Sequence, residues 1–303
     1  MLTITDDMRN DKVYDGTSPK FGVTVNGQNY IVKLRKDATD MTVICEYVAS
    51  QLIAALGVSC HEVALGYYNG ELVDVLKDFT SDGKKLHSFS DTKQSSVDTD
   101  LKAKEYTYSD VLDLIDKNLK MTPAMRALAL RQFWDMFICD AILANRDRHG
   151  DNWGYLITNN GYVPAPLYDN GSSLFPGVFG VISEYVSKQT RKDFLYQRVR
   201  QFPASLFKVR RQDRAYRTNF YEMFSDLRIN RIFAGRVKLL KSRLSVSALF
   251  SLMCNIVKDL PIDYKFKRFY VEIVVLRYSC IVLRMNFDKV YKLVEDWLVQ
   301  IEG

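Results

Sequence analysis

The stretch Asn145-Arg-Asp147-Arg-His149-Gly-Asp-Asn152 decides how this 303-residue chain is interpreted. It carries the pattern Asp-x-x-x-x-Asn, formed by Asp147 and Asn152. Phosphoryl transfer needs such groups, because a carboxylate orients the acceptor hydroxyl and oxygen ligands hold Mg²⁺ against the phosphates. The stretch therefore predicts a catalytic loop, with Asp147 acting on the acceptor and Asn152 on the metal ion.

Spacing alone is weak support for this interpretation. The pairs Asp113/Asn118 and Asp140/Asn145 have the same spacing. Both begin in stretches with helical periodicity, where residues five apart lie on different faces. Residues 145–152 instead form a polar loop between a predicted helix and a predicted strand, where side chains can converge on a ligand.

A second metal-binding acid is expected one short hairpin further on. Asp169-Asn-Gly171 is the only Asp-x-Gly in the sequence, and it follows a strand predicted to end at Tyr168. Glycine at the third position permits the turn that brings the carboxylate to a metal. The two motifs together favour a metal site over the alternative, a solvated loop followed by an ordinary turn.

A lysine on a strand and a glutamate on the next helix complete the expected set. Lys33 lies in Tyr30-Ile-Val-Lys33-Leu34, and Glu46 lies in a helix predicted over 41–56. Such a lysine binds the α- and β-phosphates of ATP and the glutamate orients it. Each residue alone would be interpreted as a surface charge, but their order ahead of the two Asp motifs favours the catalytic roles.

The phosphate-binding loop is expected between two strands ahead of Lys33. The segment 15–22 offers glycines, hydroxyls and a cation that suit phosphate, among them Gly16, Thr17, Ser18 and Lys20. It lacks Gly-x-Gly-x-x-Gly, so a plain turn is an equally good interpretation of this segment taken alone.

Composition and periodicity predict an α+β protein with a small β-rich lobe and a larger, mainly helical lobe. With 47% hydrophobic and 26% charged residues and a net charge of +6, the chain is typical of a folded protein. We divide it into an N-lobe at 1–80, a polar loop region at 81–107 and a helical C-lobe at 108–303. The expected elements are hairpins at 21–34 and 62–77, helices at 41–56, 108–119 (capped by Ser109) and 122–143, strands at 153–158 and 163–168, and basic helices beyond 183.

Several classes of protein are disfavoured. The five widely spaced cysteines contain no C-x-x-C, which favours a reduced compartment over a zinc or disulfide framework. No signal peptide or membrane span is visible, so the expected location is cytoplasmic, with specialised export left open. The cationic cluster of Lys208, Arg210, Arg211, Arg214 and Arg217 is interpreted as a solvated helix face, with a docking surface for an acidic substrate or nucleic acid as the alternative.

The assembled motifs resemble the HipA-like kinases. Leu143-Ala-Asn145-Arg-Asp147-Arg-His149-Gly-Asp-Asn152-Trp-Gly is similar to that family's N-x-D-x-H-x-x-N block, and Ala165-Pro-Leu-Tyr168-Asp169-Asn-Gly171-Ser-Ser to its P-x-Y-D-x-(G)-S block. The stretches 46–49, 77–80 and 133–137 more closely resemble a compact, stand-alone member. The resemblance covers roughly residues 12 to 210.

The resemblance implies a role for each matching residue. They are Asp147 as catalytic base, Asn152 and Asp169 as Mg²⁺ ligands, Lys33 as the phosphate-binding lysine oriented by Glu46, Gly16 to Lys20 as the ATP loop, Leu76, Lys77, Asp78 and Phe79 as the hinge at adenine, and Asn145 and His149 as organisers of the catalytic loop. It also implies autophosphorylation near the ATP loop, at Thr17 or Ser18. About a dozen residues precede that loop, whereas HipA toxins carry a further subdomain there, so an antitoxin partner is not carried over.

The function expected from the sequence is an ATP- and Mg²⁺-dependent protein kinase acting on Ser/Thr hydroxyls. The alternatives are small-molecule phosphotransfer or nucleotidyl transfer on a kinase-like fold, and a pseudokinase or binding module. We expect a protein substrate, a regulatory or antitoxin partner as an open question, and neither direct nucleic-acid nor membrane binding. The sequence leaves open the substrate, the oligomeric state, and whether the protein acts as toxin, exported effector or housekeeping enzyme.

Overall fold

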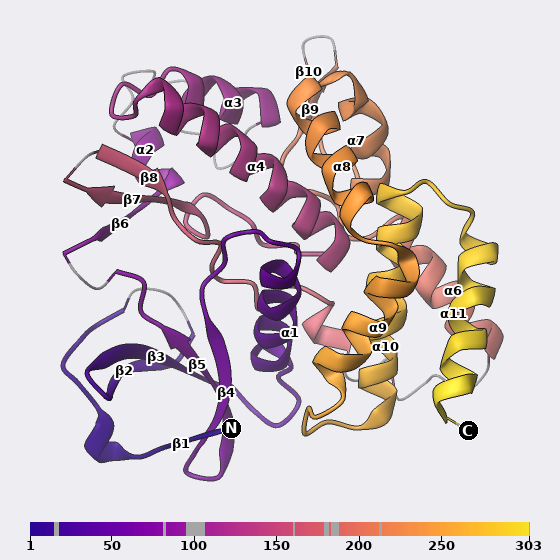
Figure 1. Ribbon diagram of the computed structural model, residues 1–303, viewed down its shortest axis with the longest axis horizontal. Helices are drawn as coiled ribbons and strands as arrows, with labels where there is room; N and C mark the ends of the chain where they lie inside the picture. Colours follow the sequence, from indigo (N-terminus) through magenta and orange to yellow (C-terminus); the bar gives the residue numbers. More distant parts are fainter. Residues whose placement is uncertain are drawn as a thin grey trace.

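The computed structural model describes residues 1–14, 18–80, 83–94, 107–159, 161–178, 182, 188–211 and 214–302. Figure 1 shows a curled sheet with one helix beside it, and a larger, mostly helical part that contains a small second sheet. The first lobe consists of β1 (Leu2–Ile4), β2 (Lys20–Val25), β3 (Gln28–Leu34), α1 (Thr42–Ala55), β4 (Val63–Tyr68) and β5 (Glu71–Lys77).

The second lobe begins with β6 (Lys85–Ser88), α2 (Phe89–Gln94), α3 (Tyr108–Asp116), α4 (Pro123–Leu143), β7 (Gly154–Thr158) and β8 (Gly161–Pro164). It continues with α6 (Lys188–Arg200), β9 (Val209–Arg211), β10 (Arg214–Tyr216), α7 (Phe220–Asp226), α8 (Arg231–Arg243), α9 (Val246–Val257), α10 (Tyr264–Arg277), the π-helical segment η5 (Tyr278–Val282) and α11 (Phe287–Glu302).

The five-stranded sheet of the first lobe has the order β1-β4-β5-β3-β2. Two tight hairpins build most of it, and their turns contain Asn26 and Asn69 with φ of 51° and 52°, each followed by a glycine with positive φ. The Asn-Gly signals therefore predicted both hairpins correctly. Strand β1, which pairs parallel with β4, was not predicted.

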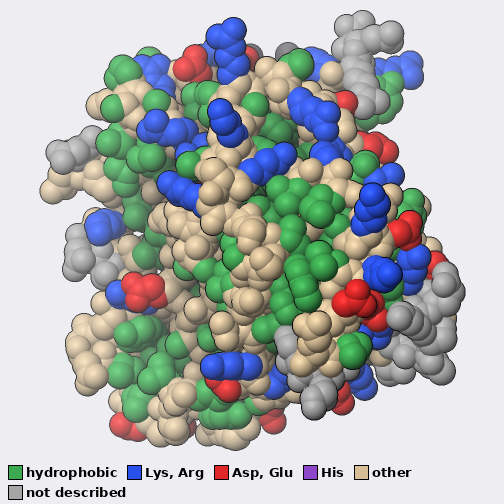
Figure 2. All heavy atoms as spheres, turned by 45° about the vertical axis from the view of Figure 1, so that its right-hand side comes forward, with side chains coloured by type: hydrophobic (Ala, Val, Ile, Leu, Met, Phe, Trp, Pro, Cys, Tyr) green, Lys and Arg blue, Asp and Glu red, His purple; other side chains and the backbone are tan. Residues whose placement is uncertain are grey.

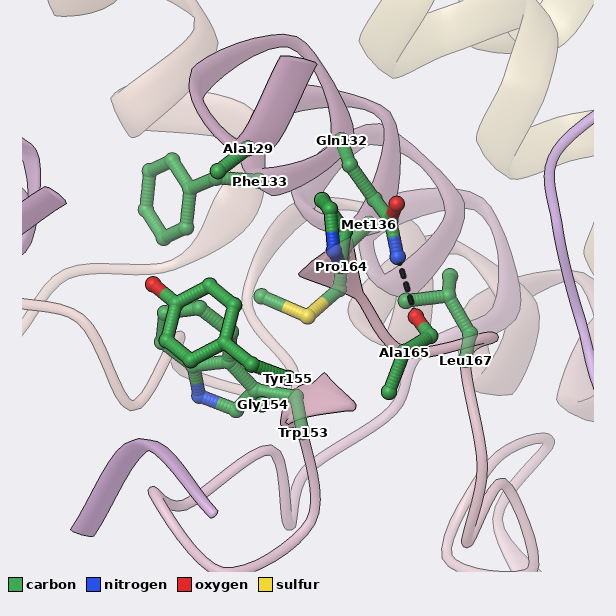
Figure 3. Close-up of a pocket in the computed structure, with 10 residues that line it drawn as sticks. All are labelled: Ala129, Gln132, Phe133, Met136, Trp153, Gly154, Tyr155, Pro164, Ala165 and Leu167. Carbon is green, nitrogen blue, oxygen red and sulfur yellow. Dashed lines mark hydrogen bonds between the residues drawn. The ribbon is translucent and has the colours of Figure 1, made fainter. Parts of the chain in front are cut away.

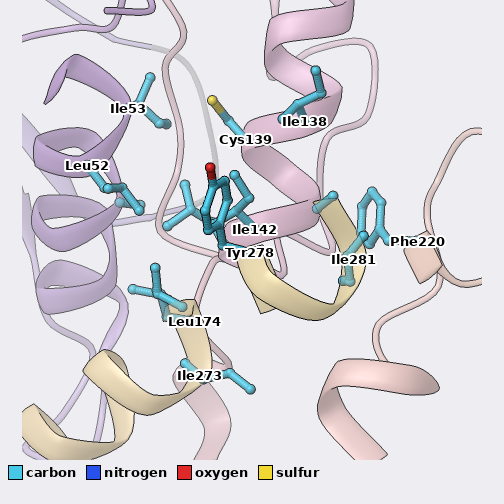
Figure 4. Packing of buried hydrophobic residues seen from close by; sticks show 14 of the residues in the cluster. Leu52, Ile53, Ile138, Cys139, Ile142, Leu174, Phe220, Ile273, Tyr278 and Ile281 are labelled. Atoms are coloured by element: carbon cyan, nitrogen blue, oxygen red, sulfur yellow. The ribbon is translucent and has the colours of Figure 1, made fainter. Parts of the chain in front are cut away.

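The helix α1 joins the two lobes through a shared hydrophobic core. One face of the sheet has its own apolar cluster, whereas the side chains of α1 belong to the same large cluster as α4, α10 and η5. Figure 4 shows Leu52 of α1, Ile142 of α4 and Ile273 of α10 directed into this cluster. The helix that carries Glu46 thus packs against the second lobe as well as against its own sheet.

Long-range pairing produces the main departures from the predicted elements. The polar region placed at 81–107 contains β6 and α2, because β6 pairs with β7 and Phe89 stacks on Trp153 with ring centroids 4.2 Å apart. The strand predicted to end at Tyr168 ends at Pro164. The chain then leaves the sheet, and the Leu167 amide donates to the Ser59 carbonyl instead (2.9 Å).

Two further predictions were wrong for local reasons. Helix α3 is capped by Thr107 rather than Ser109, because Thr107 and Asp110 form a reciprocal capping box. The cationic cluster lies on the β9–β10 hairpin rather than on a helix. There Arg210 forms an exposed ion pair with Asp110 (3.3 Å).

Within the described residues, no single helix is both long and apolar enough to cross a membrane. Only the pair α8 and α9, bent by 77° between them, meets that threshold of length and composition.

Gly154, two residues after the loop 145–152, is expected to be intolerant of a side chain. A Cβ there would lie 2.3 Å from the His87 carbonyl oxygen and 2.8 Å from Ser88 Cα, both backbone atoms. Gly154→Ala should therefore lower the free energy of unfolding by about 1–3 kcal/mol, measured by chemical denaturation. In the matched control Gly235→Ala, in the open interior of α8, the added methyl should raise it by about 0.5–1 kcal/mol. Equal effects of the two substitutions would contradict the packing argument.

Candidate active site

Three charged side chains meet where the two lobes face each other. Lys33 Nζ on β3 lies 3.1 Å from Glu46 Oε2 on α1 and 2.8 Å from Asp169 Oδ1 after the β7–β8 hairpin. The side chain of Glu46 is 2% exposed and that of Asp169 is 46% exposed. The structure thus brings together three residues that the sequence assigned to one site from positions up to 136 residues apart.

The electrostatics of this contact keep both partners charged. Burial alone would lower the pKa of Lys33, but Glu46 and Asp169 outweigh it, so the pKa is raised above its usual value. Burial alone would raise the pKa of Glu46, but Lys33 and a hydrogen bond from His61 outweigh it and the pKa is lowered. Lys33 therefore presents a permanent cation to the space between the lobes.

Backbone geometry places Asp169 at this contact. Asp169 has φ of 55°, a left-handed conformation that turns the chain sharply. The next amide, Asn170 N–H, donates to Glu46 Oε1 (2.7 Å). A Cβ on Gly171 would lie 3.2 Å from Glu46 Oε2 and 3.3 Å from the Thr42 carbonyl oxygen, so the close approach to α1 favours glycine.

The loop 145–152 follows α4 and is held by its own amides. Helix α4 ends at Leu143, and its C-cap residue Ala144 has φ of 56°. Asn145 Oδ1 accepts from the Asp147 amide (3.0 Å), and Asn152 Nδ2 donates to the Asp147 carbonyl (2.8 Å). The carboxyl group of Asp147 remains half exposed. Among the described residues only Nδ2 of the Asn152 amide makes a hydrogen bond, so its Oδ1 can accept another partner.

His149 lies at the exposed rim of the same loop. Its Nδ1 accepts from the Asp151 amide (3.3 Å), and its Nε2 lies 3.7 Å from Asp147 Oδ1. This arrangement suits a residue that shapes the loop around Asp147.

Arg148, to which the sequence analysis gave no role, is fully buried between the motifs. Its guanidinium donates to both oxygens of Asp140 and to the carbonyls of Asn152 (2.8 Å) and Tyr168 (2.6 Å). It also donates to Asn170 Oδ1 (2.6 Å). One side chain therefore fixes the end of the loop 145–152 relative to the residues on both sides of Asp169. Arg148 is part of the stretch 145–152, but its burial could not be deduced from the local sequence.

A buried chain of polar side chains continues from Arg148 to the first lobe. Asn170 Nδ2 donates to Ser50 Oγ (3.1 Å), which lies 3.1 Å from His61 Nε2. His61 Nε2 in turn lies 2.9 Å from Glu46 Oε1, and because an ionised carboxylate only accepts, this nitrogen carries the proton. We call this set of side chains the interlobe polar network; it consists of Glu46, His61, Ser50, Asn170, Arg148 and Asp140.

The proposed hinge and the segment before β2 are connected by Asp78. Asp78 Oδ2 accepts from Lys12 Nζ (2.9 Å) and from the Tyr14 hydroxyl (3.0 Å), and Oδ1 accepts from the hydroxyl and amide of Thr80. Neighbouring Phe79 contacts the ring of Tyr168 with centroids 5.8 Å apart.

The other residues expected at the ATP site lie before β2, in β2 and at the end of β5. Leu76 is buried at the end of β5, Lys77 forms an exposed ion pair with Glu62, and Lys20 lies opposite Lys33 in the β2–β3 register. Gly16 and Thr17 lie outside the described residues, and Ser18 just inside them.

The donor set fits Mg²⁺. Asn152 and Asp169 offer an amide oxygen and a carboxylate, the hard ligands that Mg²⁺ prefers. The described residues contain no group of three or more His, Cys, Asp or Glu side chains that could hold a metal ion. Mg²⁺ is commonly held by one or two protein ligands together with waters and substrate phosphates, so Asn152 and Asp169 would be enough protein ligands for it.

A small pocket lies away from this site. Figure 3 shows it between α4 and the β7–β8 hairpin, where Gln132 donates to the Ala165 carbonyl. Its volume of about 10 Å³ leaves room for one water molecule at most. This volume is too small for a nucleotide.

Fold and site together define a two-lobed, protein-kinase-like molecule, and comparison with known proteins identifies the family. Residues 14–201 match the HipA-like C-terminal domain. The chain therefore belongs to the HipA-like C-terminal domain family, and the resemblance inferred from the motifs is confirmed.

Two solved structures support the assignment of the fold. The chain is 34% identical over 182 residues to the serine/threonine-protein kinase CtkA of Helicobacter pylori, a match that spans 59% of this chain and only 54% of that protein. A crystal structure of the H. pylori proinflammatory kinase CtkA matches with a TM-score of 0.80 at 27% identity and covers 98% of each chain. HipA of Shewanella oneidensis, solved with HipB and operator DNA, matches with a TM-score of 0.58 at 14% identity, over 95% of this chain and 68% of that one. The predicted fold class is confirmed.

Arg148 should be far more important for stability than an ordinary arginine in an Arg–Asp pair. Arg148→Met leaves Asp140 buried without its partner, so the free energy of unfolding should fall by about 3–5 kcal/mol. Arg210→Met removes an exposed pair with Asp110 and should cost no more than about 1 kcal/mol. Denaturant unfolding of both variants tests the difference, and comparable losses would refute the role assigned to Arg148.

Proposed function

We propose that this protein is an ATP- and Mg²⁺-dependent kinase that phosphorylates Ser/Thr hydroxyls of proteins. The observation that carries the proposal is the contact of Lys33 with both Glu46 and Asp169 beside a loop that presents Asp147 and Asn152. These are the groups that phosphoryl transfer on a kinase fold requires. The family and the name of the CtkA relative support the same reaction class.

Lys33 would bind the α- and β-phosphates of ATP. Its raised pKa keeps the ammonium charged, and the buried carboxylate of Glu46 orients the lysine side chain. Because Glu46 is itself held by His61 and by the Asn170 amide, the lysine is oriented before the nucleotide arrives. Adenine would lie along the backbone of Leu76, Lys77, Asp78 and Phe79.

Asn152 and Asp169 would hold Mg²⁺ against the phosphates. The bound ion would neutralise charge on the β- and γ-phosphates. Asp147 would accept a hydrogen bond from the acceptor hydroxyl and orient it for in-line attack on the γ-phosphorus. Its carboxyl group is half exposed, which leaves it accessible to a protein substrate.

We also propose that Thr17 or Ser18 is an autophosphorylation site. A phosphate beside the ATP loop would compete with the phosphates of ATP through charge and volume. Peptide mapping after incubation with Mg-ATP is expected to place a phosphate on one of these two hydroxyls, and a fully modified protein with neither site occupied would refute this.

The central test compares wild type with Asp147→Ala for transfer of label from γ-labelled ATP to the protein or to a generic protein acceptor. We expect a loss of about 10²–10⁴-fold, the usual contribution of such a group. The matched control is Asp113→Ala, which removes an exposed carboxylate with the same spacing to an asparagine. Asp113→Ala should retain full activity.

The mass change of the acceptor identifies the reaction. Phosphorylation adds about 80 Da, whereas adenylyl transfer would add about 329 Da. Equal incorporation by wild type and Asp147→Ala would remove the proposed role of Asp147, and an adenylyl mass would replace the kinase with a nucleotidyltransferase.

A further inference from the structure

Asp74 on β5 lies directly opposite Lys33 on β3 in the antiparallel register. Its neighbours Val73 and Val75 belong to the apolar cluster on the outer face of the sheet, together with Val32 of β3. Because side chains alternate along a strand, Asp74 and Lys33 share the other face, which packs against α1. In such pairs the Cβ atoms are about 4.5–5.5 Å apart, so a change of rotamer can bring the two side chains into contact.

The carboxyl group of Asp74 is buried without a hydrogen-bond partner. The residue is 1% exposed, and neither oxygen has a partner among the described residues. Asp78, four positions further along, is equally buried but accepts from Lys12, Tyr14 and Thr80. An unsatisfied buried carboxyl group is destabilising, and native proteins contain few of them, so this one needs an explanation.

The groups around Asp74 disfavour its ionised form in this state. Lys33 faces it from β3, Glu46 and Cys45 from α1, and Asp40 from the segment before α1, while the opposing residue of β4 is Leu65. Burial raises the pKa of Asp74 well above its usual value, Glu46 and Asp40 add to that rise, and Lys33 opposes it. When Asp74 is neutral, Lys33 is balanced by its two charged partners, Glu46 and Asp169.

Lys33 would lose one of those partners if Asp169 coordinated Mg²⁺, as proposed. An ammonium group has three N–H donors, and the structure uses two of them, on Glu46 and Asp169. A carboxylate that coordinates Mg²⁺ no longer balances the lysine in the same way. The carboxyl group of Asp74, opposite Lys33 on the same face of the sheet, has two oxygens without a partner among the described residues and can accept the freed N–H.

We propose that Asp74 is a positioning residue that accepts a hydrogen bond from Lys33 when Asp169 is engaged by Mg²⁺, and so holds the ammonium group at the phosphates. This inference rests on the proposed function, because it takes Lys33 as the phosphate-binding lysine. Asp74 touches neither ATP nor the acceptor, and it acts only through Lys33.

The experiment measures ADP affinity of the full chain by titration calorimetry, with Mg²⁺ and with EDTA. Asp74→Leu should weaken Mg-ADP binding about tenfold or more, the usual effect of losing one hydrogen bond to a charged group. Binding without metal should change less than about twofold, since Lys33 then keeps Asp169. Asp74→Asn retains an acceptor oxygen and should stay within about threefold of wild type.

Thermal unfolding of the nucleotide-free protein supplies a readout that does not depend on nucleotide. Asp74→Leu should raise Tm by about 2–4 °C, because it removes an unsatisfied buried carboxyl group. Asp78→Leu removes the acceptor for the donors of Lys12, Tyr14 and Thr80, so it should lower Tm instead. In a Lys33→Met background, Asp74→Leu should have no metal-dependent effect on ADP affinity.

Unchanged Mg-ADP affinity in Asp74→Leu would overturn this inference and leave the proposed function intact. A fall in Tm for Asp74→Leu would also overturn it, since the carboxyl group would then have a partner in the resting state. Failure of the wild-type protein to bind Mg-ADP would overturn both proposals. Loss of the Asp147 effect on phosphate transfer, with Mg-ADP binding retained, would overturn only the proposed function.

Discussion

The rest of the site depends on the three contacts that the buried carboxylate of Glu46 makes. The carboxylate is surrounded by a lysine ammonium, a histidine N–H and a backbone amide from the other lobe. A buried carboxylate is stable only with such compensation, because desolvation otherwise drives it to the neutral form. The neighbours of Glu46 are therefore constrained as a group. The sheet must supply Lys33, and the turn after Asp169 must supply its amide.

The same requirement explains why the two lobes share a core. Hydrogen bonds tolerate only a few tenths of an ångström, so the helix with Glu46 must be held rigidly relative to the Asp169 turn. The cluster that joins α1 to α4, α10 and η5 provides this rigidity, and the interlobe polar network runs beside it. Nonpolar packing sets the distance between the lobes, and the polar contacts set the direction of the side chains within it.

The sequence predicted the parts of the site that depend on local patterns. Asn-Gly turns located the hairpins, helical spacing located α1 and α4, and the order of Lys33, Glu46, Asp147 and Asp169 indicated the chemistry. It did not predict groups whose role depends on distant partners, such as Arg148. Strand β6 was missed for the same reason, because its pairing partner β7 lies some seventy positions away. A sequence pattern within ten residues does not indicate such a distant partner, whereas a tight turn is determined almost entirely by its own residues.

The contact between Glu46 and the Asn170 amide also has a kinetic consequence. Kinases in which the corresponding helix swings outward can open the cleft by moving that helix, but here the helix is bonded directly to the opposite lobe. Under the proposed function, nucleotide exchange would then depend on other contacts near the site, among them the hydrogen bonds from Lys12 and Tyr14 to Asp78. Opening of such bonds, and not an outward swing of the helix, would limit the rate of nucleotide release, and hence turnover where release is slow.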